Sequence, residues 1–281
     1  MIFHTPLDVA ALGAQLAHHP FGWWLAGLLV AAMGGALALT GLRALQRHSP
    51  PLRHWLPTQA HWVAVAAMGF SAFTLVLAGA ALAELAESGR PGGGWGALDD
   101  AIAQGLREHA GRAVLQWFAT LTHLGDSWAL AGLTGLVAVG LWLRQHRLLA
   151  AAWLVAMGGN GALTKVLKHI FERVRPEHTH GIAEASGYSF PSGHSSASMT
   201  AYTMLAYLAT RLLPRPWHLP VAMVAGAFIF TTGWSRVVLQ VHYASDVLAG
   251  WLLAGTWVLC TVLIMESVSR WRGSHTGLLK P

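Results

Sequence analysis

Ser235-Arg-Val-Val-Leu-Gln-Val-His-Tyr-Ala-Ser-Asp246 is a stretch with ionisable residues that lies between two long apolar runs of the chain. Its ionisable side chains are Arg236, His242 and Asp246, which are costly to keep near hydrocarbon and therefore indicate a functional site. His242 and Asp246 are four residues apart, so they share one face where the chain is helical. A carboxylate there can hold one imidazole nitrogen and leave the other free to attack or to accept a proton. The alternative is a purely structural hydrogen bond that ties two helices together.

The spacing within this stretch predicts a break in the helix. Arg236 precedes His242 by six residues, which would place the two side chains on different faces of one unbroken helix. We therefore predict a break near residues 239–241, with Arg236 ending one helix and His242 opening the next.

The composition is that of an integral membrane protein. Of the 281 residues, 54% are hydrophobic and 11% are charged, whereas a soluble domain contains about 25% charged residues. The net charge of +6 comes mostly from arginines between the apolar runs, a pattern that indicates membrane topology rather than nucleic-acid binding. The single cysteine, Cys260, excludes an intrachain disulfide.

Seven apolar runs predict an all-α fold, a polytopic bundle of transmembrane helices. Each run is near the ~20 residues that a membrane helix needs. The predicted spans cover residues 22–41, 61–83, 126–143, 148–169, 194–212, 218–238 and 245–265.

Residues 97–124 differ from these runs. Their apolar side chains recur at helical spacing against a charged side, which we assign to Asp99, Asp100, Arg107 and Glu108. The pattern predicts an amphipathic helix that lies at the membrane interface or caps the bundle, and an ordinary solvated helix is the open alternative.

The distribution of basic residues predicts the orientation, because cytoplasmic loops carry an excess of Lys and Arg. Alternate connections are rich in Arg, whereas the opposite ones contain few basic residues apart from those near the candidate site. We therefore expect a multi-pass protein of the plasma membrane (in bacteria, the inner membrane), with the N-terminus and the site facing the periplasm or exterior. The basic residues near the candidate site, which are left out of this comparison, are Lys165, Lys168, Arg173, Arg175 and Arg236.

Residues 1–20 contain no Lys or Arg and are predicted to be a retained tail rather than a cleaved signal peptide.

Lys168 and Arg175 form a second cluster of polar residues. Their spacing of seven residues is close to two helical turns, so both cations point the same way if the helix persists. Pro176 disfavours helix at the preceding residue and is expected to end it at Arg175. Two fixed cations suit a phosphate, although they can also be charges that snorkel from a helix end or set the topology.

The third cluster is Pro191-Ser192-Gly193-His194, directly before an apolar run. Ser192 is a good helix N-cap, and Gly193 lets the backbone approach a ligand. The N–H groups at a helix N-terminus favour anions, and His194 would stand at the rim of that pocket. The alternative is a helix cap with an incidental histidine.

Together the clusters contain the parts of a phosphoryl-transfer site that works without a metal. These parts are charge clamps for phosphoryl oxygens, a histidine nucleophile with an orienting carboxylate, and a second histidine as acid. The spacing does not decide which histidine is the nucleophile.

At these residues the chain resembles the type 2 phosphatidic acid phosphatase superfamily, which includes membrane lipid phosphatases, glucose-6-phosphatase and the vanadium haloperoxidases. The resemblance covers three signature motifs at fixed spacing, which makes a chance match far less frequent than with one short motif. The motifs are Lys168-x6-Arg175-Pro176, Pro191-Ser192-Gly193-His194 and Ser235-Arg236-x5-His242-x3-Asp246.

The resemblance implies a role for each motif residue. His242 would attack phosphorus and form a phosphohistidine, Asp246 would orient it, and His194 would protonate the leaving oxygen and later activate water. No metal and no cofactor are implied. The residues that would hold the phosphoryl oxygens are Lys168, Arg175, Ser192, Gly193 and Arg236.

The resemblance also implies a domain organisation. Residues 61–266 would form the six-helix phosphatase core. Residues 1–60 would add a tail, one extra transmembrane helix and a basic cytoplasmic loop, and residues 267–281 would form a cytoplasmic tail.

The expected function is hydrolysis of a membrane lipid phosphate: undecaprenyl diphosphate, phosphatidylglycerophosphate or phosphatidic acid. A lipid phosphotransferase and a non-catalytic lipid-binding protein of the same fold are the alternatives. A haloperoxidase is not expected, because those relatives are soluble. The sequence leaves the oligomeric state and the source organism open.

Overall fold

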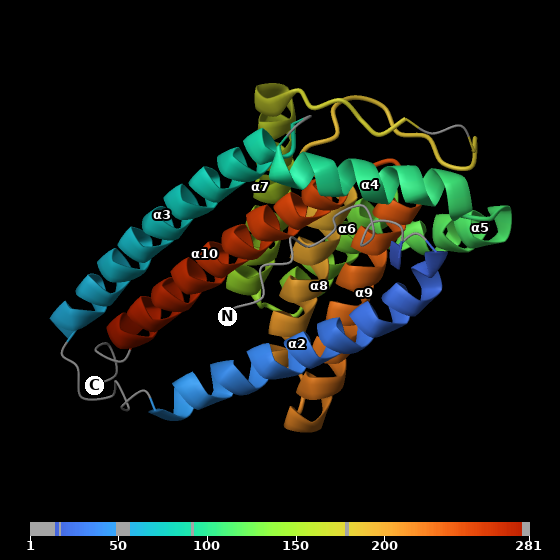
Figure 1. Cartoon of the computed structure of the whole chain (residues 1–281). Helices are drawn as coiled ribbons and strands as arrows, with labels where there is room; N and C mark the ends of the chain where they lie inside the picture. The colour runs from blue at the N-terminus through green and yellow to red at the C-terminus, as the bar shows by residue number, and fades with distance from the viewer. Residues whose placement is uncertain (1–14, 17, 49–56, 91–92, 178–179, 277–281) are drawn as a thin grey trace, which may run out of the picture.

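The computed structural model describes residues 15–16, 18–48, 57–90, 93–177 and 180–276, and every regular element within these ranges is helical (Figure 1). The all-α, multi-pass membrane fold predicted from the sequence is confirmed. Most of the predicted N-terminal tail, residues 49–56 of the predicted basic loop and the last five residues of the predicted C-terminal tail lie outside the described residues.

Seven long helices correspond to the seven predicted spans. They are α2 (Pro20–His48), α3 (Pro57–Ser88), α6 (Ser127–Leu143), α7 (Arg147–Phe171), α8 (Gly193–Leu212), α9 (His218–Val238) and α10 (Ala244–Thr276).

Helices α7 and α8 are more polar than the rest of the bundle. By length and hydropathy, five described stretches can cross a membrane, and these two helices do not reach the same hydropathy. Buried Ser195, Ser198 and Thr200 lie along α8, and buried Asn160 and Thr164 lie along α7. Because α8 packs against α7, α9 and α10, its hydroxyl groups face protein rather than lipid. The five apolar stretches are Pro20–Leu37, Val65–Ser88, Arg112–Leu143, Arg215–Val238 and Ala244–Ser269.

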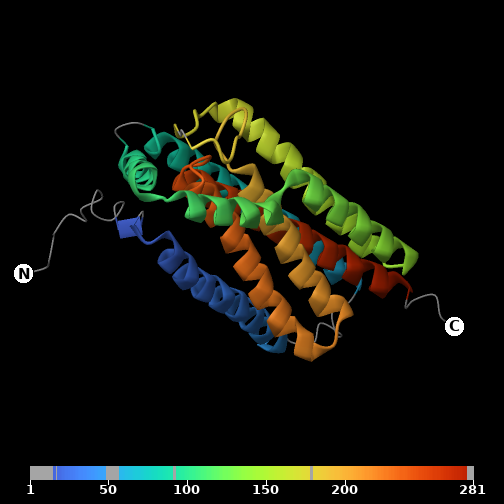
Figure 2. The ribbon, with the colours of Figure 1, turned by 90° about the vertical axis from the view of Figure 1, so that its right-hand side faces the viewer.

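The long helices pack in pairs around α8. Figure 1 shows α3 running along α10 and α2 running along α9, in agreement with the contacts of each pair. Figure 2 shows α6 and α7 as a pair on the other side of the molecule from α2. A glycine at position 250 permits a close approach of two helices, since a Cβ there would lie 2.7 Å from the carbonyl oxygen of Ser192. The start of α8 therefore touches α10, which brings the second and third motifs together.

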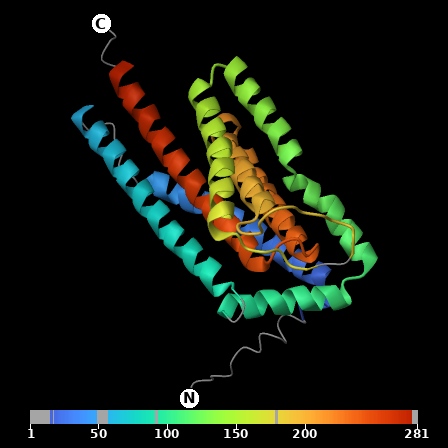
Figure 3. The same cartoon turned by 90° about the horizontal axis from the view of Figure 1, so that it is seen from above.

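Helix α4 (Gly94–His109) lies across one end of the bundle (Figure 3). Its apolar side, with Ile102 and Leu106, packs against Val237 and Val247. The prediction of one helix over residues 97–124 is wrong in detail, because α4 is followed by a separate α5 (Arg112–Leu121) and a 3-10 turn, η2 (Thr122–Gly125). The assignment of Asp99 to the solvated side is also wrong, since this carboxylate is only 1% exposed.

The predicted break before the third motif's histidine is confirmed. Helix α9 ends at Val238, Gln240 adopts a left-handed conformation with φ of 52°, and α10 begins at Ala244. His242 lies in the turn itself rather than at the first position of α10.

Helix α7 ends earlier than predicted. It stops at Phe171, where Glu172 adopts a left-handed conformation with φ of 47°, so no continuous helix connects Lys168 to Arg175. The chain turns back because Ser189 bonds to it twice: its N–H donates to the carbonyl oxygen of Arg173 and its hydroxyl donates to that of Val174. The two cations therefore converge through a loop instead of through helical periodicity.

Candidate active site

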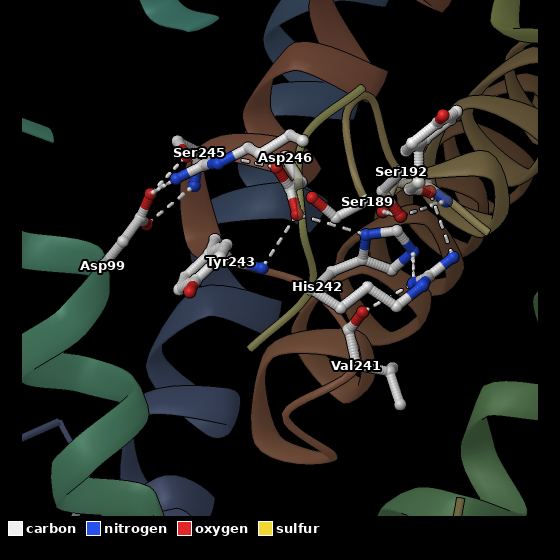
Figure 4. A network of polar contacts seen from close by, with 12 residues as sticks. Asp99, Ser189, Ser192, Val241, His242, Tyr243, Ser245 and Asp246 are labelled. Atoms are coloured by element: carbon white, nitrogen blue, oxygen red, sulfur yellow. Dashed lines mark hydrogen bonds and ion pairs between the residues drawn. The ribbon is translucent and has the colours of Figure 1, made fainter. Parts of the chain in front are cut away.

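His242 and Asp246 form a buried pair at the start of α10 (Figure 4). His242 Nδ1 lies 3.2 Å from Asp246 Oδ2, and the N–H of Tyr243 donates to the same oxygen at 3.0 Å. On the other side of the ring, Arg175 Nη1 lies 3.1 Å from His242 Nε2. A guanidinium can only donate, so Nε2 accepts and Nδ1 carries the proton that is donated to Asp246. This tautomer leaves the lone pair of His242 on Nε2.

The surroundings of His242 keep its imidazole neutral. Burial lowers the pKa of His242 well below its usual 6.5, and the positive charges of Arg175, Arg236 and Lys168 lower it further, with His194 adding to the effect. A neutral imidazole with an exposed lone pair is the form that can attack an electrophile.

Lys168 and Arg175 are held by carbonyl groups of the loop between α7 and α8. Arg175 donates to the carbonyl oxygens of Gly187 and Ser186 at 2.9 and 3.0 Å, and to that of Val241 at 2.6 Å. Lys168 Nζ donates to the carbonyl oxygen of Tyr188 at 2.5 Å, which also accepts from Arg175. The loop thus fixes both cations beside the nucleophile candidate.

Arg236 approaches the same place from α9. It is 5% exposed, and its Nη1 donates to the hydroxyl of Thr122 at 2.9 Å. Its Nε is buried and has no hydrogen-bond partner among the residues that the structure describes. A buried guanidinium N–H without a partner is costly, which indicates that a ligand normally completes this site.

The three cations of the site are not neutralised by carboxylates. Within the described ranges, the only arginine near the site that forms ion pairs is Arg173, which binds Asp99 and Asp246. Lys168, Arg175 and Arg236 form no ion pair in that part of the chain. The pocket around His242 Nε2 therefore carries excess positive charge, which favours an anion.

The second motif lies directly against the third. The N–H of Ser192 donates to the carbonyl oxygen of Asp246 at 2.9 Å. Its buried side chain accepts from the N–H of Ser195, so the predicted N-cap of α8 is confirmed. Gly193 is the first residue of α8, which places N–H groups of the helix N-terminus at the site.

His194 has a carboxylate partner of its own. His194 Nε2 lies 3.2 Å from Asp126 Oδ1, and the other oxygen of Asp126 lies 2.7 Å from His123 Nδ1. The His194 and Asp126 side chains are 23% and 37% exposed, whereas those of His242 and Asp246 are 3% and 0% exposed. The two histidine–carboxylate pairs thus differ in access to solvent.

The structure brings all eight predicted site residues to one end of the bundle. Four further residues join them to which the sequence analysis assigned no role in the site: Asp99, Asp126, Arg173 and Ser245. For two of these residues, the sequence contained a signal that pointed to the site. Asp99 shares helical spacing with Ile102, Ala103 and Leu106, which are all buried, and Arg173 lies inside the first motif.

These features define a class of protein: a multi-pass membrane protein with a buried histidine–carboxylate pair, a second histidine, and three cations that form no ion pair within the described ranges, all at one end of the bundle. A family model described as the PAP2 superfamily matches residues 149–270, which include all eight predicted site residues. The chain belongs to this superfamily, and the resemblance inferred from the motifs is confirmed.

Curated relatives agree with this assignment. Phosphatidylglycerophosphatase B of Bacillus subtilis is 36% identical over 135 residues, which are 47% of this chain and 66% of that protein. Decaprenylphosphoryl-5-phosphoribose phosphatase of Mycobacterium tuberculosis is 33% identical over 145 residues, which are 48% of this chain and 72% of that protein. The match to the first of them therefore covers slightly less than two thirds of its length.

A solved structure has the same fold. It is described as the crystal structure of a transmembrane PAP2 type phosphatidylglycerolphosphate phosphatase from Bacillus subtilis. The two chains superpose with a TM-score of 0.61 and are 29% identical. The match covers 69% of this chain and 96% of the other.

Proposed function

We propose that this protein is a membrane lipid phosphatase that cleaves a phosphomonoester or diphosphate of a lipid through a phosphohistidine at His242. The observation that carries the proposal is the positive charge around an accepting imidazole nitrogen: Nε2 of His242 faces Arg175, and neither Arg175, Lys168 nor Arg236 has a carboxylate partner among the described residues. The named relatives are phosphatases of lipid or prenyl-linked phosphates, which supports the same substrate class.

In the first chemical step, His242 Nε2 attacks phosphorus. A P–N bond forms while the P–O bond to the lipid breaks, and the electron pair of that bond leaves with the lipid oxygen. His194 donates a proton to this oxygen, and the Asp246 carboxylate supports the positive charge that develops on the ring of His242. Lys168, Arg175, Arg236, Ser192 and the N–H of Gly193 hold the phosphoryl oxygens.

In the second step, water attacks the phosphorus of the phosphohistidine. His194, now neutral, accepts a proton from the water, the P–N bond breaks, and inorganic phosphate leaves with His242 neutral again. The carboxylate of Asp126 at 3.2 Å supports His194 in its protonated state.

Substrate binding requires a rearrangement at Arg175. Its Nη1 donates to the lone pair of His242 that must attack phosphorus, so this bond has to break when the phosphate enters. A phosphoryl oxygen is a stronger acceptor than the imidazole nitrogen, and a guanidinium binds such oxygens in a fork. The incoming phosphate thus draws Arg175 away and exposes the nucleophile.

A lipid substrate fits a site at the end of a bundle of membrane-spanning helices, because the phosphate of a lipid lies at the membrane surface. Helix α4 lies across this end with Trp95 partly exposed, which is typical of an interfacial helix. An apolar tail can reach the site laterally between helices. We assign this end to the outer face of a bacterial inner membrane, residues 61–266 to the phosphatase core, and the flanking residues 1–60 and 267–281 to the extra helix with its loop and to a cytoplasmic tail.

The test is phosphate release by purified protein in detergent. The substrates are undecaprenyl diphosphate, phosphatidylglycerophosphate, phosphatidic acid and a soluble phosphomonoester. His242→Ala removes the proposed nucleophile. His169→Ala is the matched control, because His169 is an exposed histidine in the last turn of α7, near Lys168. Release by the wild type and the control but not by His242→Ala supports the proposal. Transfer of the phosphoryl group to a second lipid would favour a phosphotransferase, and lipid binding without any turnover would favour a non-catalytic protein.

A further inference from the structure

Arg173 connects two buried carboxylates that come from distant parts of the chain. Its Nη1 donates to Asp246 Oδ1 at 2.8 Å, and its Nη2 donates to Asp99 Oδ2 at 2.9 Å. The side chains of Asp99 and Asp246 are both 0% exposed, and that of Arg173 is 14% exposed. Figure 4 shows Asp99 on its helix next to Ser245 and Asp246 at the start of α10.

The guanidinium of Arg173 is fixed on all sides. Its Nη2 also donates to the carbonyl oxygen of Gly89 at 2.7 Å, and its Nη1 donates to the hydroxyl of Ser245 at 2.6 Å. The ring of Tyr243 lies 4.4 Å from its central carbon, within the range of a cation–π contact. A planar fork with this many partners holds one orientation, which a lysine could not reproduce.

Asp99 also fixes the first turn of α10. Its Oδ1 accepts from the N–H of Ser245 at 3.1 Å, and its Oδ2 accepts from the Ser245 hydroxyl. Burial raises the pKa of Asp99, and the bonds from Ser245 and Arg173 oppose that rise. The helix that lies across the end of the bundle is thereby tied to the residue that precedes Asp246.

The bonds of Asp246 divide between its two oxygens. Oδ1 accepts from Arg173, whereas Oδ2 accepts from His242 Nδ1 and from the N–H of Tyr243. Without Arg173, the carboxylate would lose the bond that keeps Oδ2 turned toward the imidazole. The orientation of His242 therefore depends on Arg173, and that of Arg173 depends on Asp99.

We propose that Arg173 and Asp99 are positioning residues, which hold Asp246 against His242 and make the nucleophile dependent on the docking of α4. Neither residue is expected to touch the phosphoryl group, since both lie on the far side of Asp246 from His242 Nε2. The inference rests on the proposed function, because its main readout is the rate of phosphate release.

The inference predicts opposite shifts of the acid limb of the pH profile for the two residues. The groups that face His242 are Asp246, Arg175, Arg236, Lys168 and His194. Removing the positive charge of Arg173 leaves the negative charge of Asp246 less neutralised at the imidazole of His242. This favours protonated His242 and moves the acid limb to higher pH. Removing the negative charge of Asp99 leaves the positive charge of Arg173 less neutralised, which disfavours protonated His242 and moves the acid limb to lower pH.

The experiment measures kcat, KM and the pH profile of kcat/KM for Arg173→Gln, Arg173→Lys and Asp99→Asn. Asp100→Asn is the matched control, because Asp100 is exposed and directly follows Asp99 on α4. For Arg173→Gln we expect kcat to fall by roughly tenfold or more, as with other groups that orient a catalytic histidine, while KM stays nearly constant. The control should keep wild-type values for all three quantities.

The second variant keeps the test decisive if Arg173→Gln does not fold. Arg173→Lys retains the charge but cannot reach both carboxylates, so kcat should fall while the acid limb stays near its wild-type position. An unchanged kcat in folded Arg173→Lys and Asp99→Asn would overturn the inference, as would a loss that appears in KM alone. An inactive wild type would instead overturn the proposed function, so the two failures are distinguishable.

Discussion

Arg175 Nη1 donates to His242 Nε2 at 3.1 Å, directly at the atom that would attack phosphorus. The bond fixes the tautomer of His242, because an arginine cannot accept a proton and Nδ1 must then donate to Asp246. It also places a full positive charge next to the imidazole, which disfavours a second proton on the ring. In the proposed mechanism, the pair would keep the imidazole of His242 in its reactive form until a phosphate displaces the guanidinium.

The pH dependence of catalysis follows from the burial of His242 and, after that, from its contact with Arg175. Since the pKa of His242 is lowered well below 6.5, the neutral ring persists as the pH falls through 6.5 and becomes protonated only at a lower pH. The acid limb of kcat/KM should therefore lie below pH 6.5, because this parameter reports the free enzyme. The measurement is phosphate release between pH 4 and 9 in detergent, with buffers of constant ionic strength. An acid limb at or above the ordinary histidine value would contradict the role assigned to His242.

Lys168 and Lys165 provide a matched pair for the phosphate clamp. Both are lysines on α7, but Lys168 donates to the carbonyl oxygen of Tyr188 inside the site, whereas Lys165 is exposed. Lys168→Ala should lower kcat by roughly 10²-fold, as the loss of one oxyanion donor does elsewhere. Lys165→Ala should stay near the wild type. Equal effects of the two substitutions would show that the cations act through membrane topology or surface charge instead.

The role of His194 is tested with the leaving group. A lipid alcohol needs a proton as it leaves, whereas 4-nitrophenolate is stable without one, so the acid matters less for 4-nitrophenyl phosphate. His194→Ala should therefore release lipid alcohol far more slowly than the wild type. It should still give a burst of nitrophenol, followed by slow hydrolysis of the phosphohistidine. An equal loss of the first step with both substrates would contradict the assignment of His194 as the acid.

Metal independence is the fourth prediction. Lys168, Arg175 and Arg236 supply the positive charge that a divalent ion would otherwise bring to the phosphoryl oxygens. Dialysis against EDTA should leave kcat and KM unchanged in the detergent assay. A loss of activity that Mg²⁺, Mn²⁺ or Zn²⁺ restores would mean that a metal takes part.

Local sequence patterns predicted the elements that depend on local chemistry. Apolar runs near the length of a membrane span predicted the long helices, and Ser192 before a helix predicted the cap of α8. The spacing of Arg236 and His242 predicted the break between α9 and α10, because one unbroken helix would place the two side chains on different faces.

Features that depend on tertiary contacts could not be predicted in the same way. The early end of α7 at Phe171 follows from bonds between Ser189 and the backbone of Arg173 and Val174. Asp99 was assigned to the solvated side because a carboxylate is usually exposed, and only the packing of α4 against α10 provides its partners. Asp126 precedes α6 without any local signal that it would meet His194.

The most direct test of the account is detection of the phosphohistidine. His194→Ala is mixed with excess 4-nitrophenyl phosphate, whose leaving group needs no acid, quenched within seconds in alkali, where phosphohistidine is stable, and digested for mass spectrometry. We predict a phosphoryl group on the peptide that contains His242, with the modification lost in the His194→Ala/His242→Ala double variant. A burst of nitrophenol without any adduct, or an adduct on another residue of the chain, would contradict the central claim.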